Sequence, residues 1–159
     1  MVKCKNMKKI LLFGLFLFCC ISLSAQIVEV EKQKLEKVGE VRPGGLSLLS
    51  SIQVVRDPLK DGTNLYLWTY SNAGYRTISD IKSFEFNATE KDFNSLYDML
   101  KIQIAGPKGT EKQILLGKTN VSFKTMRSMG ISSFTVIDLS NDGFFYLTSS
   151  QLDKLFGKN

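Results

Sequence analysis

Carboxylates are the side chains with which this sequence could do acid–base chemistry, because the commoner catalytic groups are missing. The chain contains no histidine, which removes imidazole-activated nucleophiles and most metal sites built on imidazole. All three cysteines lie within the first 25 residues. Two carboxylates held in one cleft can act as acid and base without histidine. The candidates are Asp80, Glu85, Asp138 and Asp142.

Asp138 is the most interesting of the four, because Phe134 and Val136 share its face of an expected strand. An apolar setting raises the pKa of a carboxyl group, whereas a place at the sheet edge or strand end would leave it facing water. The spacing of the four carboxylates does not show any two of them meeting. The sequence therefore predicts no catalytic residue, and we expect the protein not to be an enzyme.

Two short segments match parts of ligand-binding motifs and fail at required positions. Residues 117–119 read Gly-Lys-Thr, like the end of a phosphate-binding loop, but position 112 holds lysine where that loop needs glycine. Residues 57–68 match three positions of a calcium loop, but the third position is leucine and the twelfth is tryptophan instead of oxygen ligands. We therefore expect no cofactor and no metal ion.

The first 25 residues have the layout of a secretory signal peptide. Lysines come first, residues 10–21 form an apolar run, and small residues follow up to Ala25. The run resembles bacterial Sec signals, and it is shorter than the about 20 apolar residues that span a membrane. Cleavage after Ala25 would make Gln26 the first residue and would remove every cysteine. We expect an exported protein, located in the periplasm or outside the cell.

The alternative is a lipid anchor on Cys20, which would make the protein an outer-membrane lipoprotein. Bacterial lipoprotein signals resemble a pattern of leucine, two small residues and cysteine. Leu17 fits this pattern, but Phe18 is bulky and Cys19 is unusual beside the modified residue. Plain cleavage is therefore the preferred interpretation.

The formal charge of +6 overstates how basic the exported chain is. Four of the 21 basic residues and none of the 15 acidic residues lie in the first 25 positions, so processing would leave a net charge of +2. A nearly neutral chain lacks the electrostatic footprint of a nucleic-acid-binding protein. We expect no nucleic-acid partner, and membrane contact only through the signal peptide or the possible lipid.

The rest of the chain is about one domain in length and predicts an α+β fold. Residues 26–45 form an N-terminal arm that ends at the break "RPGG", and residues 46–159 form a single domain. Alternating apolar residues and turn signals predict strands, and three- and four-residue spacing predicts helices. The expected strands are 46–56, 65–70, 81–87, 112–116, 121–124, 133–139 and 144–147, and the expected helices are 90–101 and a C-terminal helix from residue 148.

We expect an antiparallel β-sheet with these two amphipathic helices packed on it. Thr89 is a natural N-cap for the mid-chain helix, and Thr148 with Gln151 forms a capping box for the C-terminal helix. The helix starts "TEKDFNSLY" and "TSSQLDKLF" share a pattern, so the chain can be read as two strands-then-helix halves. Any capped amphipathic helix after a strand would look similar, so a true duplication stays open.

An aromatic strand offers the best candidate for a binding face. Tyr66, Trp68 and Tyr70 alternate and so share one face, while leucines occupy the opposite face. The aromatic face can be packed in the core, which is the usual role of such stripes, or it can be an exposed platform for a sugar, a peptide or a partner. The candidate partner or ligand face is Tyr66, Trp68, Tyr70, Tyr75 and Arg76.

A weaker candidate is the segment "KTMRSMGI" near an expected turn. Met126 and Met129 flank Arg127 there, and methionines on a loop tip adapt to varied partners. The same methionines can equally tuck under the sheet.

The sequence thus favours a small exported, non-catalytic binding protein of the bacterial cell envelope. Its partner would be a protein or another envelope component, met through the aromatic face or an exposed sheet edge. One alternative is a small-ligand carrier with an apolar cavity beside Trp68. The other is a carboxylate hydrolase, which would need two carboxyl groups close together in a cleft.

Overall fold

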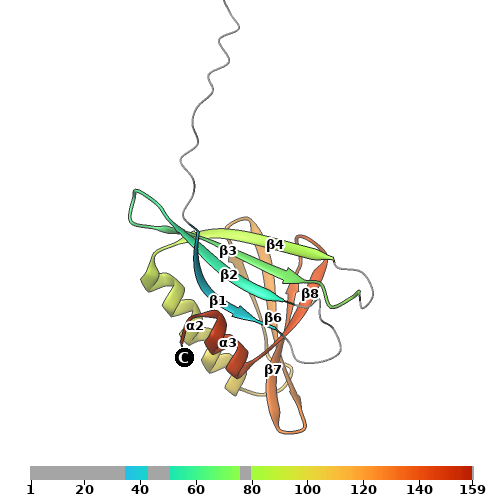
Figure 1. Cartoon of the computed structure of the whole chain (residues 1–159). Coiled ribbons are helices and arrows are strands. Elements are labelled where there is room, and N and C mark those ends of the chain that lie inside the picture. The colour runs from blue at the N-terminus through green and yellow to red at the C-terminus, as the bar shows by residue number, and fades with distance from the viewer. Residues whose placement is uncertain (1–34, 43–50, 76–79, 159) are drawn as a thin grey trace, which may run out of the picture. The chain divides into compact units, whose positions relative to one another are not determined.

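The computed structural model describes residues 35–42, 51–75 and 80–158, which form two antiparallel four-stranded sheets and two helices (Figure 1). The first sheet has the order β1-β2-β3-β4 and the second has the order β5-β6-β7-β8. The elements are β1 (Glu36–Val41), β2 (Ile52–Pro58), β3 (Asn64–Ser71), β4 (Ile81–Ala88), α2 (Glu90–Ala105), β5 (Glu111–Leu116), β6 (Thr119–Ser128), β7 (Ile131–Asp138), β8 (Gly143–Thr148) and α3 (Ser149–Leu155).

The predicted α+β class is confirmed: the strands are antiparallel and the helices pack on them. Each half consists of four strands followed by one helix, although the strands divide into two sheets. Residues 36–41, which the sequence places in the N-terminal arm, form edge strand β1 beside β2. The remainder of the predicted arm, and residues 46–50 of the first predicted strand, lie outside the described residues.

Both predicted helix caps are present. The Thr89 hydroxyl accepts a hydrogen bond from the Asp92 amide (3.1 Å). At α3, the Thr148 hydroxyl accepts from the Gln151 amide (3.3 Å), and the Gln151 side chain accepts from the Thr148 amide (2.8 Å), which completes the capping box. Helix α2 continues four residues beyond its predicted end, because Ile104 still packs into the core.

Each helix packs against strands of both sheets. Helix α3, at the end of the second half, lies on β1 and β2 of the first sheet as well as on β8. Helix α2 lies on β6 and β7 of the second sheet as well as on β4. The approach of α3 to β1 requires a glycine, since a Cβ at Gly39 would lie 2.1 Å from the Lys154 carbonyl oxygen. The two halves are therefore interlocked through their helices.

A continuous series of aromatic rings fills the core between the sheets and helices. Successive ring centroids lie 4.0–6.2 Å apart, within or close to the range of favourable aromatic pairing. The series connects β4, α2, the residue after α3, and β8. Its members, in order of contact, are Phe86, Tyr66, Phe93, Phe156, Trp68, Phe84, Tyr70 and Phe145.

A buried polar contact joins the two sheets at one end of this series. The Tyr70 hydroxyl of β3 donates to Oδ2 of Asp138 on β7 (2.9 Å). Asp138 is fully buried, and its carboxylate also accepts from the amides of Ser140 (3.1 Å) and Asn141 (3.0 Å) and from the Asn141 side chain (2.8 Å). Burial, and then the hydrogen bond to Asp138, raise the pKa of the Tyr70 phenol far above its usual value.

We expect Tyr70→Phe to lower the free energy of unfolding by about 1–2 kcal/mol at neutral pH, because Asp138 loses one buried donor. An unfolded chain ionises tyrosine near pH 10, whereas folded Tyr70 keeps its proton. The stability that depends on protonated Tyr70 is therefore complete below about pH 10 and is lost as the pH rises further. Urea titrations from neutral to alkaline pH should show a shallower alkaline loss in Tyr70→Phe than in the wild type.

The control is Tyr146→Phe, which removes a hydroxyl from a tyrosine that is 56% exposed. This variant should unfold like the wild type at every pH. Equal stability of Tyr70→Phe and the wild type would show that the contact between Tyr70 and Asp138 does not join the sheets energetically.

Candidate functional site

The aromatic strand lies in the core. Tyr66, Trp68 and Tyr70 are all buried. The Tyr66 ring packs against Phe93 of α2, the Trp68 ring packs against Phe156 after α3, and the Tyr70 ring packs against Phe145 of β8. These three side chains therefore do not form an exposed platform, and the structure matches the core alternative. Tyr75, another residue of the predicted face, does not lie with these three side chains in the core.

Tyr75 is exposed in the turn after β3. Arg76 lies outside the described residues, as do the possible processing residues Cys20, Ala25 and Gln26. The proposed face is therefore not assembled in the described part of the chain.

The carboxylates of Asp138 and Asp80 make contacts at the junction between the sheets, whereas Asp142 contributes a backbone carbonyl there and Glu85 does not take part. Asp138 has both oxygens occupied by protein donors, as described above. Asp80 accepts from the Asn72 side chain (2.8 Å), and Lys82 Nζ lies 3.8 Å from its Oδ2. The Asp142 carbonyl accepts from Lys82 Nζ (3.0 Å) in the turn before β8. Glu85 lies exposed on β4. Among the described residues, no group of three or more histidine, cysteine or carboxylate side chains gathers as a metal site.

Prominent clefts lie between described residues of the domain. Four clefts of about 270–460 Å3 are found there, and Trp68 lines none of the four. The most voluminous lies on the outer face of the first sheet, with Leu65 and Leu67 on its floor and Glu85 and Lys118 among its polar lining residues. It is open and mixed in polarity, unlike the apolar cavity that a small-ligand carrier would use.

Strand β5 presents an edge without hydrogen-bond partners in the described part of the chain. Leu116 and Thr119 flank a two-residue turn in which Gly117 has a φ of +61°, so these two residues form a hydrogen-bonded pair. Residues 112, 114 and 116 then direct their backbone groups toward β6. The backbone N–H and C=O groups of residues 111, 113 and 115 point away from the sheet.

Contacts on the far side of β6 confirm this register. The Leu139 amide donates to the Asn120 carbonyl (3.0 Å), and the Asn120 amide donates to the Ser140 hydroxyl (3.1 Å). Asn120 therefore faces β7, and its neighbours Thr119 and Val121 face β5, as the pairing requires.

Each of the other edge strands makes at least one contact with another part of the chain. On β8, the Phe144 carbonyl accepts from the Ala73 amide (2.8 Å), and the Phe144 amide donates to the Asn72 side chain (3.2 Å). On β4, the Ser83 carbonyl accepts from the Asn141 side chain (3.4 Å). Helix α3 lies against β1. The outward backbone of β5 makes no such hydrogen bond among the described residues, and the strand carries neither a proline nor a bulge.

A groove of about 350 Å3 runs between β5 and α2 and ends at β4. The wall from α2 consists of residues spaced by three and four, which is one stripe of a helix. The stripe is Asp92, Ser95, Leu96 and Met99. Ile114, Leu115 and Leu116 line the opposite wall, and Leu115 is 70% exposed. We call this feature the β5–α2 groove. It comprises the outward backbone of β5, the wall from α2 and the wall from β5.

The residues that line the β5–α2 groove are suited to binding more than to catalysis. Asp92 is its one charged lining residue, and the Asp92 carboxylate already accepts from the Thr89 hydroxyl (2.7 Å) at the start of α2. The remaining lining is apolar, amide or hydroxyl. The sequence predicts a sheet edge as a possible binding surface, but it does not identify β5 or its position beside the α2 stripe, because these depend on the order of strands in the sheet.

Comparisons with known proteins find no matching protein family, no matching curated protein and no matching solved structure. None of the helices in the described part of the chain is long and apolar enough to cross a membrane. Function must therefore be argued from the geometry of this chain.

Amide hydrogen exchange should alternate along β5. The amides of residues 112, 114 and 116 are bonded to β6 and should exchange slowly, whereas those of Gln113 and Leu115 should exchange at rates typical of unprotected amides. NMR-detected exchange on the folded protein measures each amide separately. Slow exchange at both Gln113 and Leu115 would mean that another part of the chain pairs with β5.

Proposed function

We propose that this chain is an exported, non-catalytic binding protein of the cell envelope that holds an extended segment of a partner protein along β5. The observation that carries the proposal is the unpaired edge of β5 beside the apolar β5–α2 groove. The signal-like first 25 residues support export. The absence of histidine from the chain, and the use of Asp138 inside the core, support a binding role over a hydrolytic one.

Strand addition is the binding mode that fits this edge. A partner strand would exchange main-chain hydrogen bonds with residues 111, 113 and 115, and its side chains would alternate between the two faces of the sheet. One set of side chains would enter the β5–α2 groove beside Leu96 and Met99. The other set would lie on the opposite face of the sheet.

The groove must supply part of the affinity. Three residues offer six outward backbone groups, and each hydrogen bond contributes about 1 kcal/mol net. A dissociation constant of about 1 μM requires about 8 kcal/mol, and the partner also loses conformational freedom when it becomes ordered. Apolar side chains buried against Met99 and Leu115 are the source available for the difference, so the partner segment should carry apolar residues at alternate positions.

Gln113→Pro tests the proposal directly. Proline removes the outward N–H of residue 113 and leaves the β6-facing pairs intact, and an edge strand tolerates it on its free side. The matched control is Gln113→Ala, which keeps the N–H. Peptides selected by the wild-type protein from a random phage-displayed library should bind Gln113→Ala as they bind the wild type and should bind Gln113→Pro at least about tenfold more weakly, as expected for about 1.4 kcal/mol or more.

The site of binding is checked by NMR chemical shifts on the wild-type protein, which should move in residues 111–116 and in the α2 stripe. Unchanged peptide binding by folded Gln113→Pro, or shift changes confined to other surfaces, would contradict strand addition at β5. A dimer that forms in the wild type and is lost in Gln113→Pro, detected by sedimentation, would identify a second copy of this chain as the occupant.

A further inference from the structure

The hairpin of β6 and β7 has a tip that the fold itself does not explain. The hairpin extends beyond the helices at one end of the described domain (Figure 1). Its two-residue turn consists of Met129 and Gly130, with φ angles of +49° and +77°. Both turn residues thus have positive φ, a pattern that favours asparagine or glycine at each position. Met126, predicted near the turn, lies on β6 and is half-buried.

Met129 is unfavourable at this position for two independent reasons. A long side chain in the left-handed region is uncommon, and asparagine is several-fold enriched there. The Met129 side chain is also 99% exposed, and Ile131, two residues further, is 59% exposed. Neither backbone geometry nor core packing accounts for an apolar side chain at this place. A contact outside the chain would account for it.

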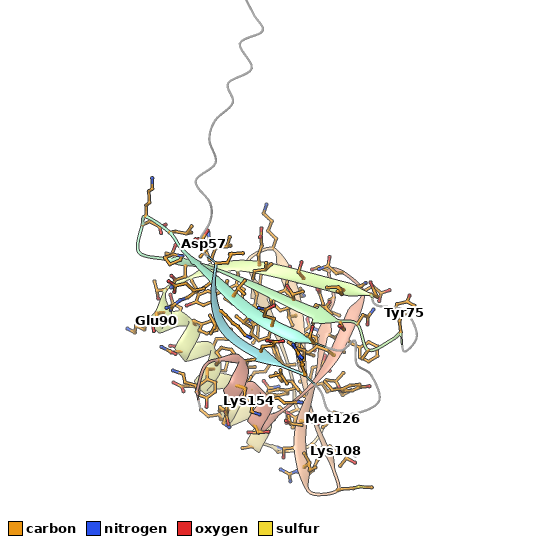
Figure 2. The ribbon with its side chains drawn as sticks, in the orientation of Figure 1. Asp57, Tyr75, Glu90, Lys108, Met126 and Lys154 are labelled. Atoms are coloured by element: carbon orange, nitrogen blue, oxygen red, sulfur yellow. The ribbon has the colours of Figure 1, made fainter. Side chains whose placement is uncertain are left out.

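The surroundings of the tip are cationic. No acidic residue occurs from position 112 to position 137, whereas Lys124 and Arg127 lie on the β6 arm of the hairpin. The loop that carries Lys108 runs beside the same arm, because the Gly109 amide donates to the Thr125 carbonyl (2.8 Å). Figure 2 shows Lys108 and Met126 at this end of the domain. Glu111, the acid opposite Lys124, accepts from the Ser122 hydroxyl (2.6 Å).

We propose that this tip docks on an anionic lipid surface. Met129 and Ile131 enter the boundary between headgroups and acyl chains, and Lys108, Lys124 and Arg127 lie near the lipid phosphates. Apolar side chains beside cations are the combination that binds such surfaces. A lipid surface accepts a narrow, protruding tip with two apolar side chains, whereas a protein partner would need a deep pocket to bury them. This contact is separate from the β5–α2 groove and from any contact made by the signal peptide or a lipid anchor.

Met129→Asn distinguishes an effect on vesicle binding from an effect on stability, because the melting temperature should rise while vesicle binding weakens. Asparagine relieves the backbone strain at position 129, so the melting temperature should rise. It also removes the apolar side chain, so binding to vesicles should weaken by about tenfold, as expected when most of the burial of one methionine is lost. Ile131→Thr should weaken binding similarly. The control is Ile81→Thr, at a residue that is 62% exposed on β4 and distant in sequence from the tip.

The measurement is co-sedimentation of the protein, purified as the host exports it, with vesicles of phosphatidylcholine with or without phosphatidylglycerol. Wild-type protein and Ile81→Thr should bind the vesicles that contain phosphatidylglycerol, and their binding should fall as salt is added. An N-terminal lipid or an uncleaved signal peptide would affect vesicle binding by all variants equally. The difference in vesicle binding between variants therefore measures the contribution of the hairpin tip.

Wild-type binding that Met129→Asn and Ile131→Thr both retain would overturn the proposal, as would equal binding to neutral and anionic vesicles. Absence of vesicle binding by the wild-type protein would also overturn it and would direct attention to a partner protein with an acidic, apolar pocket. Gln113→Pro should bind vesicles like the wild type, so failure of this inference and failure of strand addition at β5 are distinguishable.

Discussion

The rest of the structure depends on the exchange of helices between the two sheets. Each helix follows the strands of one half and packs against strands of both, so neither sheet can bury its inner face without the other half of the chain. The aromatic series runs through this shared space and places rings from β3, β4, β8 and α2 in one connected core. A sheet of four strands with one helix would leave much of this aromatic surface in water, and burial of that surface is the main favourable term available. The domain is therefore expected to fold as one cooperative unit without disulfides.

Asp138 adds specificity to this largely apolar core. A buried carboxylate without partners would be costly, and Asp138 avoids that cost by accepting four hydrogen bonds. Three of them come from the turn after β7, and the fourth comes from Tyr70 in the other sheet. Only one relative placement of the two sheets satisfies the carboxylate in this way. Gly143 supports the placement, because a Cβ there would lie 2.6 Å from the Tyr70 hydroxyl oxygen.

Local features of the fold were readable from the sequence, and the long-range ones were not. Both helix starts were predicted from Thr89, Thr148 and Gln151, because a helix cap involves residues only three positions apart. The three- and four-residue spacing in α2 showed that residues such as Phe93 and Leu100 would be buried, but not which sheet would bury them. The strand with Tyr66 and Trp68 was ambiguous because both of its faces are apolar or aromatic, and only the position of the helices decides which face becomes core. The open edge of β5 depends on strand order, which single-strand periodicity does not encode.

The same helix exchange explains why β5 is open. Helix α2 lies over β6 and β7 with its buried stripe, which includes Phe93 and Leu100, and so presents Asp92, Ser95 and Met99 at its side, next to β5. The connection from α2 then returns along β6 and pairs there through Gly109 and Thr110, which leaves the outer edge of β5 without a neighbouring strand among the described residues. A flat edge with an exposed leucine favours pairing with other chains, and natural edges are commonly guarded by charge, proline or a bulge. In β5 the charged residues Glu111 and Lys112 lie at the start of the strand, and the stretch from Gln113 to Leu116 has no charge, proline or bulge. An unguarded edge beside an apolar groove is the arrangement expected when pairing with a partner is the function of the strand.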